Sequence, residues 1–568
     1  MAKIDGGRVI AKVLKEEGVK HLHTLGGGHN IPIVRGCVAE GIDVFGYRGE
    51  LGVAHAADGY ARGSRGVGVA CITAGVGVTN AMTGIASAFV DNIPMVVLAG
   101  RHNTADDGKG ALQEMDGVDA VIAVTKWRKC VHDFSQLAPF TAAAFREALS
   151  PSPGPTFLEI PYDILSSDIE DSYVRIPPSR LTRTEGRVHG DAACIEKATA
   201  MLIAAEKPVV VSGDGAFWSG VGSELKELAE LLQLPVYTTR LGQGTLSEYH
   251  PLSVHRVVRS KLTRECDVAL SLGVKFWRGE GFGNEPAIWN PEYKLIQVDP
   301  AENRIGHNVA PEVSIWGDPK AVVGQILECA KEMLKSKTLA DRAAWLEALK
   351  KHRQDLDERN VEEVKANADK RPIHPAVLCQ AIMESIEPDT TVVYDGMYSV
   401  SFMERYMKAT IPGQVIPLNL HGAMGPGVPW AIGAQLGRPD KRLVLLSGDG
   451  AFGIGGMEIE TAAKYNLPIV IVLHNNNAWF PRLGTDQEAK AYTFQPRLRY
   501  DRMAEALGCY GQFVDDPAEV KPAIKRALES GKPSLVNCIV DPTASSGLYS
   551  RGGQGAEGAR GALKVRFW

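Results

Sequence analysis

Oxygen-bearing side chains stand at a fixed spacing in the last third of the chain. Asp449 lies in GDGAFGIGG, directly after an apolar run, and 24 residues separate Gly450 from Asn475, Asn476 and Asn477. If one helix joins two neighbouring strands here, the carboxylate and an amide meet at adjacent strand ends. Hard oxygen ligands of this kind suit Mg²⁺, which fills its remaining octahedral positions with ligand phosphates. The glycines would let backbone N–H groups approach a diphosphate at a helix N-terminus.

The sequence SGDGAF occurs a second time, at 212–217, again after an apolar run. The residues that follow this copy differ, because 24 residues after Gly215 the chain has Arg240 and Leu241 in place of an asparagine pair. Without a partner amide, we interpret Asp214 as a structural residue at a strand end.

The elements that must position these side chains are short apolar runs bounded by glycine or proline, which are typical of buried parallel strands. Stretches of helical periodicity, such as 223–233 and 517–530, lie between them. Strands that alternate with helices predict doubly wound α/β units, in which ligands bind at the carboxyl ends of strands. The predicted strands lie within 67–75, 93–100, 207–215, 267–273, 293–299, 390–396, 441–450 and 467–477.

Two polar segments divide the chain. Residues 165–190 are proline-containing and indicate a linker, and residues 340–371 are highly charged and predict a helical connector. We therefore expect an α/β protein of three doubly wound parallel-sheet domains followed by a glycine-rich tail, with bounds 1–165, 190–340, 372–545 and 546–568.

Composition excludes several classes of protein. The 62 basic and 67 acidic side chains give a net charge of −5, so the basic footprint of a nucleic-acid-binding protein is missing. The nine cysteines are odd in number and form no CxxC pair, which argues against a disulfide framework and a thiolate metal site. The sequence has neither the apolar core of a signal peptide nor an apolar run of about 18 residues. We expect a cytoplasmic protein that binds neither nucleic acid nor membrane.

A GDG, a helix-length spacer and an asparagine pair form the signature of thiamine-diphosphate (ThDP) enzymes, and the chain resembles this family. The resemblance implies ThDP and Mg²⁺ as cofactors. Asp449 and Asn476 match the side-chain ligands of the metal, and the backbone carbonyl of Ala478 matches a third ligand. Gly450 and Ala451 match residues that contact the diphosphate.

Residues 44–100 resemble the pyrimidine-binding domain of the same family, and Glu50 stands where the family's glutamate stands. The resemblance implies that this carboxyl contacts the aminopyrimidine and favours the imino tautomer that activates the thiazolium C2. Residues 421–436 resemble the segment that holds the cofactor in its V shape, with Met424 as the bulky support and Gly422 near the aminopyrimidine. Residues 392–399 match a turn that contacts the diphosphate through Gly396, Met397 and Tyr398.

In this family the glutamate-bearing domain of one subunit faces the metal-bearing domain of another. The resemblance therefore implies a homo-oligomer, a dimer or a tetramer, with active sites shared between subunits.

Two features concern the substrate. His29 and Gln113 match the polar pair that benzaldehyde lyase and its relatives turn toward the substrate carbonyl, and an imidazole and an amide can relay protons to an oxyanion. Past the metal motif, Glu488 and Tyr492 are four residues apart and share a face if this stretch is helical. A base near a 2-hydroxyl would start carbon–carbon cleavage, whereas a decarboxylase needs none. Either Glu488 or His29 could be that base.

The chain end resembles that of two CoA-dependent members. Residues 534–547 are similar to the last strand of oxalyl-CoA decarboxylase and 2-hydroxyacyl-CoA lyase. The tail after them is basic and could close as a lid over an anionic nucleotide ligand by arginine–phosphate pairing. Its charged residues are Arg551, Arg560, Lys564 and Arg566 against Glu557.

These features together predict a ThDP- and Mg²⁺-dependent lyase that reversibly cleaves a 2-hydroxyacyl-CoA to an aldehyde or ketone plus formyl-CoA. Oxalyl-CoA decarboxylase, acetohydroxyacid synthase and a benzaldehyde-lyase-type carboligase remain open alternatives. A non-catalytic scaffold of the same fold is a further alternative, against which the intact Glu50, Asp449 and Asn476 argue. The small-molecule partner would be an acyl-CoA. ADP is a further predicted ligand, because relatives in this family hold ADP, FAD or the CoA nucleotide in the middle domain.

Overall fold

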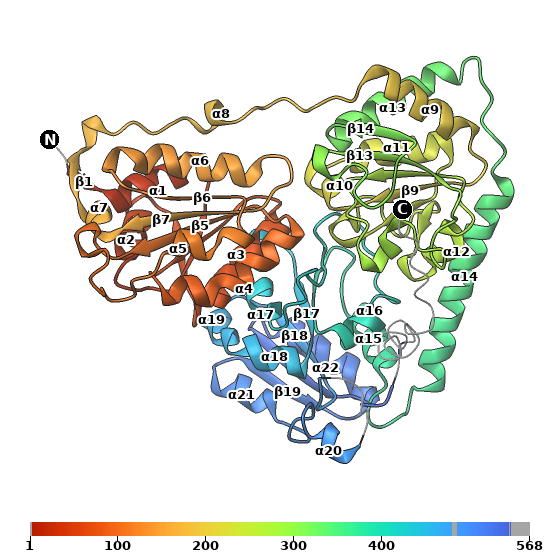
Figure 1. Cartoon of the computed structure of the whole chain (residues 1–568). Coiled ribbons are helices and arrows are strands. Elements are labelled where there is room, and N and C mark those ends of the chain that lie inside the picture. The colour runs from red at the N-terminus through yellow and green to blue at the C-terminus, as the bar shows by residue number, and fades with distance from the viewer. Residues whose placement is uncertain (1–2, 480–484, 545, 547–568) are drawn as a thin grey trace.

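The computed structural model describes residues 3–479, 485–544 and 546. Three successive units each fold around a six-stranded parallel sheet flanked by helices (Figure 1). The fold is the doubly wound α/β fold that the alternating pattern predicts. In Figure 1 the N-terminal unit is red to orange, the central unit is yellow to green, and the C-terminal unit is teal to blue.

The N-terminal sheet has the order β3(Asp43–Gly46), β2(His21–Thr24), β4(Gly68–Ile72), β5(Met95–Arg101), β7(Pro155–Pro161), β6(Trp127–Cys130). Glycine lets the first helices pack closely, since a Cβ on Gly7 would lie 2.2 Å from the Pro32 carbonyl carbon. The principal helices of this unit are α1(Gly6–Glu16), α2(Ile31–Ala39), α3(Glu50–Ser64), α4(Val76–Asp91) and α6(Leu137–Leu149).

The central sheet has the order β11(Ser253–Val254), β10(Val236–Thr238), β9(Pro208–Ser212), β12(Val268–Leu272), β13(Lys294–Asp299), β14(Val313–Trp316). Counted along the chain within the sheet, this is the 3-2-1-4-5-6 order of dinucleotide-binding folds. Its principal helices are α9(Ala192–Ala204), α10(Asp214–Ser219), α11(Gly222–Leu232) and α13(Pro319–Met333).

The C-terminal sheet has the order β16(Val415–Ile416), β15(Thr391–Asp395), β17(Leu443–Gly448), β18(Val470–Asn475), β20(Ser534–Ile539), β19(Tyr510–Val514). Counted within each unit, this order is the same as that of the N-terminal sheet, 2-1-3-4-6-5, so the two units share one topology. The order reverses between β15 and β17, which is where such sheets bind ligands. The principal helices are α15(Pro375–Met383), α16(Met397–Met403), α17(Gly427–Gly437), α18(Asp449–Gly455), α21(Tyr500–Ala506) and α22(Pro517–Glu529).

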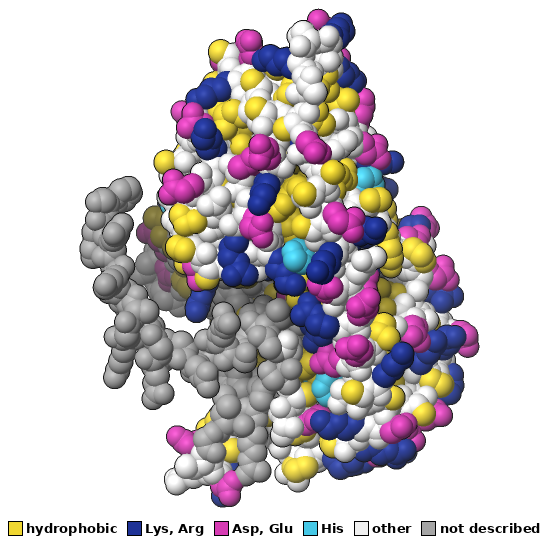
Figure 2. Space-filling model, turned by 90° about the vertical axis from the view of Figure 1, so that its right-hand side faces the viewer, with side chains coloured by type: hydrophobic (Ala, Val, Ile, Leu, Met, Phe, Trp, Pro, Cys, Tyr) yellow, Lys and Arg dark blue, Asp and Glu magenta, His cyan; other side chains and the backbone are white. Residues whose placement is uncertain are grey.

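Both predicted connectors take the expected form. After β7, the chain adds β8(Asp168–Glu170), which pairs antiparallel with β1(Lys3–Asp5), and then crosses to the central unit through α8(Ser179–Thr182) (Figure 1). The charged connector is a helix, α14(Ala343–Ala366), that runs along one side of the molecule from the central to the C-terminal unit. Figure 2 shows that side, where Lys and Arg side chains are interspersed with Asp and Glu.

Helices α3 and α17, which come from the two units of shared topology, have their backbones in close contact at glycines. A Cβ on Gly433 would lie 1.9 Å from the carbonyl oxygen of Ala56, and a Cβ on Gly59 would lie 2.4 Å from that of Trp430. Only glycine permits this approach. The contact places the N-terminus of α3 beside the C-terminal unit, where Glu458 accepts the backbone N–H of Arg48 at 3.1 Å.

A network of buried charges joins the N-terminal and central units, and Asp91 links it to the C-terminal unit by accepting the N–H of Leu420. Asp91, the last residue of α4, pairs with Arg62 (Oδ2 to Nη2, 2.9 Å) and with Arg240 of the central unit (Oδ1 to Nη2, 2.7 Å). Asp58 and Asp214 complete the network, and all five side chains are at most 5% exposed. Burial alone would raise the pKa of the Asp91 carboxyl, but Arg240 and Arg62 outweigh it and hold this pKa at about 2.

Among the described residues, no helix combines the length and the apolar character needed to cross a membrane. All nine cysteines are described, and each is a free thiol.

Candidate active site

The first part of the candidate site is Asp449, at the point where β17 ends and α18 begins. Its side chain is buried, and Oδ1 accepts the N–H of Gly450 at 3.0 Å. Oδ2 is buried with no hydrogen-bond partner among the described residues. Burial raises the pKa of the Asp449 carboxyl to about 7, although backbone N–H groups such as that of Asn477 act in the opposite direction. An unpartnered buried carboxylate oxygen is suited to a cation.

The three asparagines after β18 have different surroundings. Asn475 donates to Asn537 on the neighbouring strand at 2.9 Å, and Asn477 Oδ1 accepts a backbone N–H from the following loop at 2.6 Å. Asn476 is buried, and its Oδ1 accepts the N–H of Ala478 within its own turn at 3.2 Å. Asn475 is thus committed to the sheet and Asn477 to the loop, which favours Asn476 as the amide that could bind a metal.

Glycines let the backbone around Asp449 pack closely against its neighbours. A Cβ on Gly450 would lie 2.6 Å from the ring of Trp479, and one on Gly455 would lie 2.0 Å from the carbonyl oxygen of Gly425. Gly396 caps the start of α16 with φ of +96°, a conformation that favours glycine. Of the other predicted diphosphate residues, Ala451 is buried, Tyr398 is half-buried and Met397 is exposed.

The segment that carries Gly422 and Met424 is an ordered turn. Asn419 closes it by accepting the N–H of Ala423 at 3.0 Å and donating to its carbonyl at 3.1 Å. Gly422 is exposed with φ of +77°, and Met424 is half-buried. The N-terminal unit contacts this segment, because Asp91 accepts the N–H of Leu420 at 3.0 Å.

Asp395, which the sequence analysis missed, holds the residues just after Met424. Its carboxylate accepts the N–H of Gly425 at 3.3 Å and of Gly427 at 2.8 Å. Burial raises its pKa to about 7 against the effect of these hydrogen bonds. The sequence contained an indication of this role, because an Asp-Gly pair follows an apolar run at Asp395 and Gly396, as it does at Asp449 and Gly450.

In the N-terminal unit, Glu50 is the first residue of α3 and is 5% exposed. Its Oε2 accepts Nδ2 of Asn80 at 3.1 Å, and a Cβ on Gly77 would lie 3.4 Å from its Oε1. Asn80 is a second contact that the sequence analysis missed. It lies on α4, so only the packing of α4 on α3 places it beside the glutamate.

The structure brings His29 and Gln113 together, although 83 residues separate them. His29 Nδ1 lies 3.0 Å from Gln113 Oε1, and Thr73 Oγ1 donates to the same oxygen at 3.3 Å. Burial lowers the pKa of His29, and the hydrogen bond to Gln113 offsets this only in part. The imidazole is therefore neutral near pH 7 and can accept a proton.

Glu488 and Tyr492 do not share a helical face, because α20(Asp486–Ala489) ends before Tyr492. Glu488 is exposed and forms a capping box, in which its Oε2 accepts the N–H of Thr485 at 2.7 Å and its hydroxyl at 2.8 Å. These bonds lower the pKa of Glu488. The backbone carbonyl of Tyr492 accepts the N–H of Trp479 at 2.9 Å.

The second GDG is structural, as its missing partner amide predicts. Asp214 accepts the N–H of Leu241 at 3.2 Å and pairs with Arg240 at 3.4 Å. The predicted C-terminal lid, residues 546–568, lies outside the described residues except for Ser546.

Comparison with known proteins decides which family has this arrangement. Three models of thiamine pyrophosphate enzymes match the chain: the N-terminal TPP binding domain (4–120), the central domain (195–326) and the C-terminal TPP binding domain (396–538). A probable acetolactate synthase of Mycobacterium bovis is 32% identical over 95% of this chain and 96% of its own length. The chain belongs to the thiamine pyrophosphate enzyme family. The family's cofactor, thiamine diphosphate, fits this site through a cation: the unpartnered Asp449 oxygen suits the cation, which would in turn hold the diphosphate.

Other thiamine pyrophosphate enzymes are nearly as similar. The 2-hydroxyacyl-CoA lyase of Arabidopsis thaliana is 29% identical, and the human 2-hydroxyacyl-CoA lyase 1 is 26% identical, each over 96% of both chains. Synthases and lyases both stand among the relatives, so similarity determines the family and its cofactor and leaves the reaction open.

Proposed function

We propose that this thiamine pyrophosphate enzyme cleaves the carbon–carbon bond of a 2-hydroxyacyl-CoA, releasing an aldehyde or ketone and formyl-CoA. The observation that carries the proposal is the contact between His29 and Gln113. Cleavage of a 2-hydroxyacyl group requires a base for the hydroxyl proton, and a neutral, half-buried histidine in a fixed tautomer can act as that base.

The tautomer follows from the hydrogen bonds. Thr73 Oγ1 donates to Gln113 Oε1, which orients the amide with its oxygen toward His29. His29 Nδ1 then carries the proton that it donates to this oxygen, and Nε2 keeps its lone pair. In our proposal His29 Nε2 accepts the hydroxyl proton, and Gln113 orients the ring. Glu488, which accepts two hydrogen bonds in its own capping box, is the less favoured base, and Tyr492 is proposed only as a residue near the substrate.

The cofactor and metal would be held by the C-terminal unit. We assign Mg²⁺ to the side chains of Asp449 and Asn476 and the backbone carbonyl of Ala478. The diphosphate would lie against residues of two strand ends, and Gly422 and Met424 would support the ring system. When bound, the cofactor supplies an electron sink next to the substrate carbonyl. The proposed diphosphate contacts are Gly396, Met397, Tyr398, Gly450 and Ala451.

Glu50 would hold a proton at the aminopyrimidine of a cofactor bound by a second subunit. Apolar side chains on both halves of the candidate site support this shared arrangement. Val76 and Leu112, near Glu50 and Gln113, are 49% and 79% exposed, and Ile454 on α18 is 49% exposed. Exposed apolar side chains around a polar centre are typical of an interface. We therefore propose a homodimer or homotetramer, which sedimentation velocity would test.

Acetolactate synthase is a second candidate, because the 32% identity to the mycobacterial synthase exceeds the identity to the lyases quoted above. The deciding experiment is product analysis by mass spectrometry of the Mg²⁺- and ThDP-loaded enzyme with 2-hydroxyacyl-CoA esters, oxalyl-CoA, pyruvate and benzoin. Formyl-CoA and an aldehyde from the first substrate would support the lyase. Acetolactate from pyruvate, with the CoA esters intact, would refute it.

ADP remains part of the proposal as a ligand of the central unit. A cavity at the carboxyl edge of its sheet is lined by Gly215, Gly273, Asp299 and Arg304. The buried Asp299 Oδ2 has no hydrogen-bond partner among the described residues, and burial raises the pKa of this carboxyl to about 6. Calorimetric titration of ADP into wild type and Arg304→Ala would test this site. Binding that the variant leaves unchanged would rule out this cavity.

A further inference from the structure

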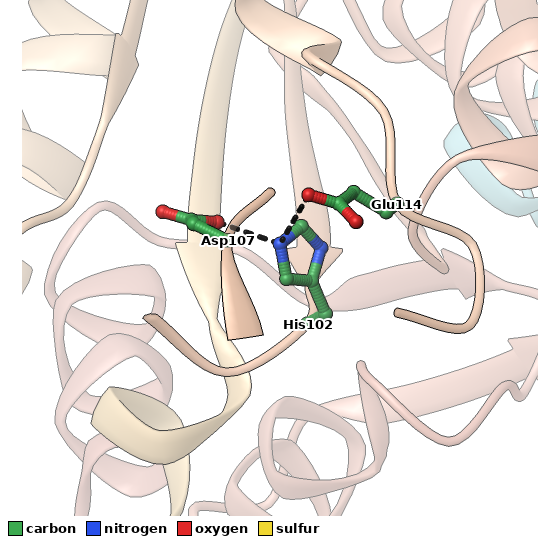
Figure 3. A group of neighbouring side chains, drawn as sticks. All are labelled: His102, Asp107 and Glu114. Carbon is green, nitrogen blue, oxygen red and sulfur yellow. Dashed lines mark hydrogen bonds and ion pairs between the residues drawn. The ribbon is translucent and has the colours of Figure 1, made fainter. Parts of the chain in front are cut away.

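A histidine and two carboxylates meet at the carboxyl end of β5, in the part of the N-terminal unit that carries Gln113 (Figure 3). His102 Nε2 lies 2.6 Å from Asp107 Oδ1 and 3.8 Å from Glu114 Oε1. The imidazole is buried, with 3% of its surface exposed, while both carboxylates come from the loop that follows. We call these three residues the His102 clasp.

The clasp shapes the loop that ends at Gln113. Glu114 accepts the backbone N–H of Gly108 at 2.5 Å, of Gly110 at 2.7 Å and of Ala111 at 2.9 Å, which closes the loop on itself. Gln113 has φ of +61°, a left-handed conformation that costs energy for a residue with a Cβ. Contacts around Gln113 must therefore hold it in this conformation.

The end of β5 also contacts the partner of Gln113. A Cβ on Gly100 would lie 2.6 Å from the Cβ of His29, so this strand end supports the histidine directly. His102 lies two residues after Gly100 and contacts the loop that carries Gln113. Arg101 fastens the same loop, because it donates to Asp107 at 2.9 Å and to Glu159 at 3.0 Å.

The hydrogen bonds favour a clasp over a metal site. The 2.6 Å separation of His102 Nε2 and Asp107 Oδ1 is a direct hydrogen bond, so no ion fits between these atoms. Asp107 Oδ1 also accepts from Arg101, and both Glu114 oxygens accept backbone N–H groups. Because a carboxylate only accepts, the proton of this bond lies on Nε2.

We propose that His102 is a positioning residue, whose Nε2–H bond to Asp107 holds the loop so that Gln113 Oε1 meets His29 Nδ1. The effect on turnover rests on the function proposed above for His29 and Gln113. The effect on the loop does not, because it concerns only the folded chain.

The test compares His102→Ala, which removes the donor, with His102→Gln, whose amide can still donate to Asp107. His132→Ala, which alters an exposed histidine in the same unit, is the matched control. Trypsin reports on the loop through Lys109, which is exposed on it. We expect His102→Ala to speed cleavage after Lys109 at least tenfold, with His102→Gln and the control close to wild type. Unchanged cleavage in His102→Ala would overturn the proposal, whatever the enzyme turns over.

The kinetic arm uses the ThDP-loaded enzyme and whichever substrate the wild type converts. We expect His102→Ala to lower kcat about 10- to 100-fold, since misplacement near 1 Å can cost that much, with the Kd for ThDP unchanged in calorimetry. Gln113→Ala should cost a similar factor, and the double variant should cost no more than either alone. A fully additive double variant, or a loss of ThDP affinity in His102→Ala, would contradict a positioning role. If the wild type cleaves no hydroxyacyl-CoA, the proposed function fails, while the proteolysis result still decides the clasp.

Discussion

The buried carboxylate of Asp91 is the point at which a single substitution should affect all three units. It pairs with Arg62 in its own unit and with Arg240 in the central unit, and it accepts the N–H of Leu420 in the C-terminal unit. Asp91→Asn keeps the shape of the side chain and leaves an acceptor for the N–H of Leu420, but it removes the negative charge. Among the described residues, the two buried guanidinium groups would then keep Asp58 and Asp214 as their carboxylate partners.

The magnitude follows from burial. Removing one partner of a fully buried ion pair costs about 3 to 5 kcal/mol, because the remaining charge is left without compensation. We expect Asp91→Asn to lower the free energy of unfolding by an amount in this range. Glu312→Gln breaks an exposed pair with Lys197 and should leave stability unchanged within error.

The pH dependence isolates the charge. Asp91 has a pKa of about 2 in the folded chain, below the usual value of about 3.9 for an unfolded aspartate. Its stabilising effect is therefore fully present above pH 4 and is lost as pH falls toward 2, a contribution of about 2 to 3 kcal/mol. The stability difference between wild type and Asp91→Asn should shrink over this interval.

The assay is urea denaturation followed by tryptophan fluorescence, at pH 7 and at steps from pH 5 down to the lowest pH at which wild type stays folded. Asp91→Leu, which also removes the acceptor for Leu420, should in addition weaken ThDP binding at pH 7, because Leu420 leads into Gly422. A variant as stable as wild type at pH 7, or a difference that stays constant as pH falls, would refute the reasoning about this network.

Four further predictions concern the candidate site. Glu50→Gln should abolish exchange of the thiazolium C2 proton measured by NMR, and exchange at the wild-type rate would remove Glu50 from its role. Asp449→Asn should weaken Mg²⁺-dependent ThDP binding in calorimetry at least tenfold, since one proposed ligand of the metal loses its charge. Wild-type affinity in this variant would argue against Asp449 as a metal ligand. His29→Asn should lower kcat by a factor of about 10² to 10⁴. Glu488→Gln, whose side chain can still cap its helix, should keep most of the activity. The reverse result would make Glu488 the base. Truncation after Ser546 should raise KM for CoA substrates and leave KM for small 2-hydroxyketones unchanged, and an unchanged KM for the CoA substrates would speak against a lid.

Much of the fold could be predicted because buried parallel strands are continuous apolar runs. Each of the eight predicted runs matches one strand, from β4 in 67–75 to β18 in 467–477, and only β5 extends past its run, by one residue. One missed strand, β7, has seven buried residues. Other missed strands are short or polar, such as β11 with two residues and β6, which contains Arg128 and Lys129. Such segments carry little periodic signal, and neighbouring strands determine their conformation.

Pattern alone overestimated the helix after the metal motif. A spacing of four predicted that Glu488 and Tyr492 could share a face, but α20 ends at Ala489. Glu488 lies three residues after Thr485, which is the spacing of a capping box. The same carboxylate thus fits a local capping role that the sequence already contained.

The sequence by itself predicted which groups could bind a metal and a diphosphate, because Asp449 and Asn476 belong to one strand–helix–strand unit whose geometry is local. It also determined the strand pattern of three α/β units, because apolar runs need burial wherever they pack. The family resemblance named His29 and Gln113 as a pair, but only the tertiary structure decided how distant groups meet. His29 and Gln113 lie 3.0 Å apart, and Asp91 joins three units, through contacts between segments far apart in the chain. Such contacts depend on how sheets and loops are placed relative to one another, and no local spacing encodes that placement.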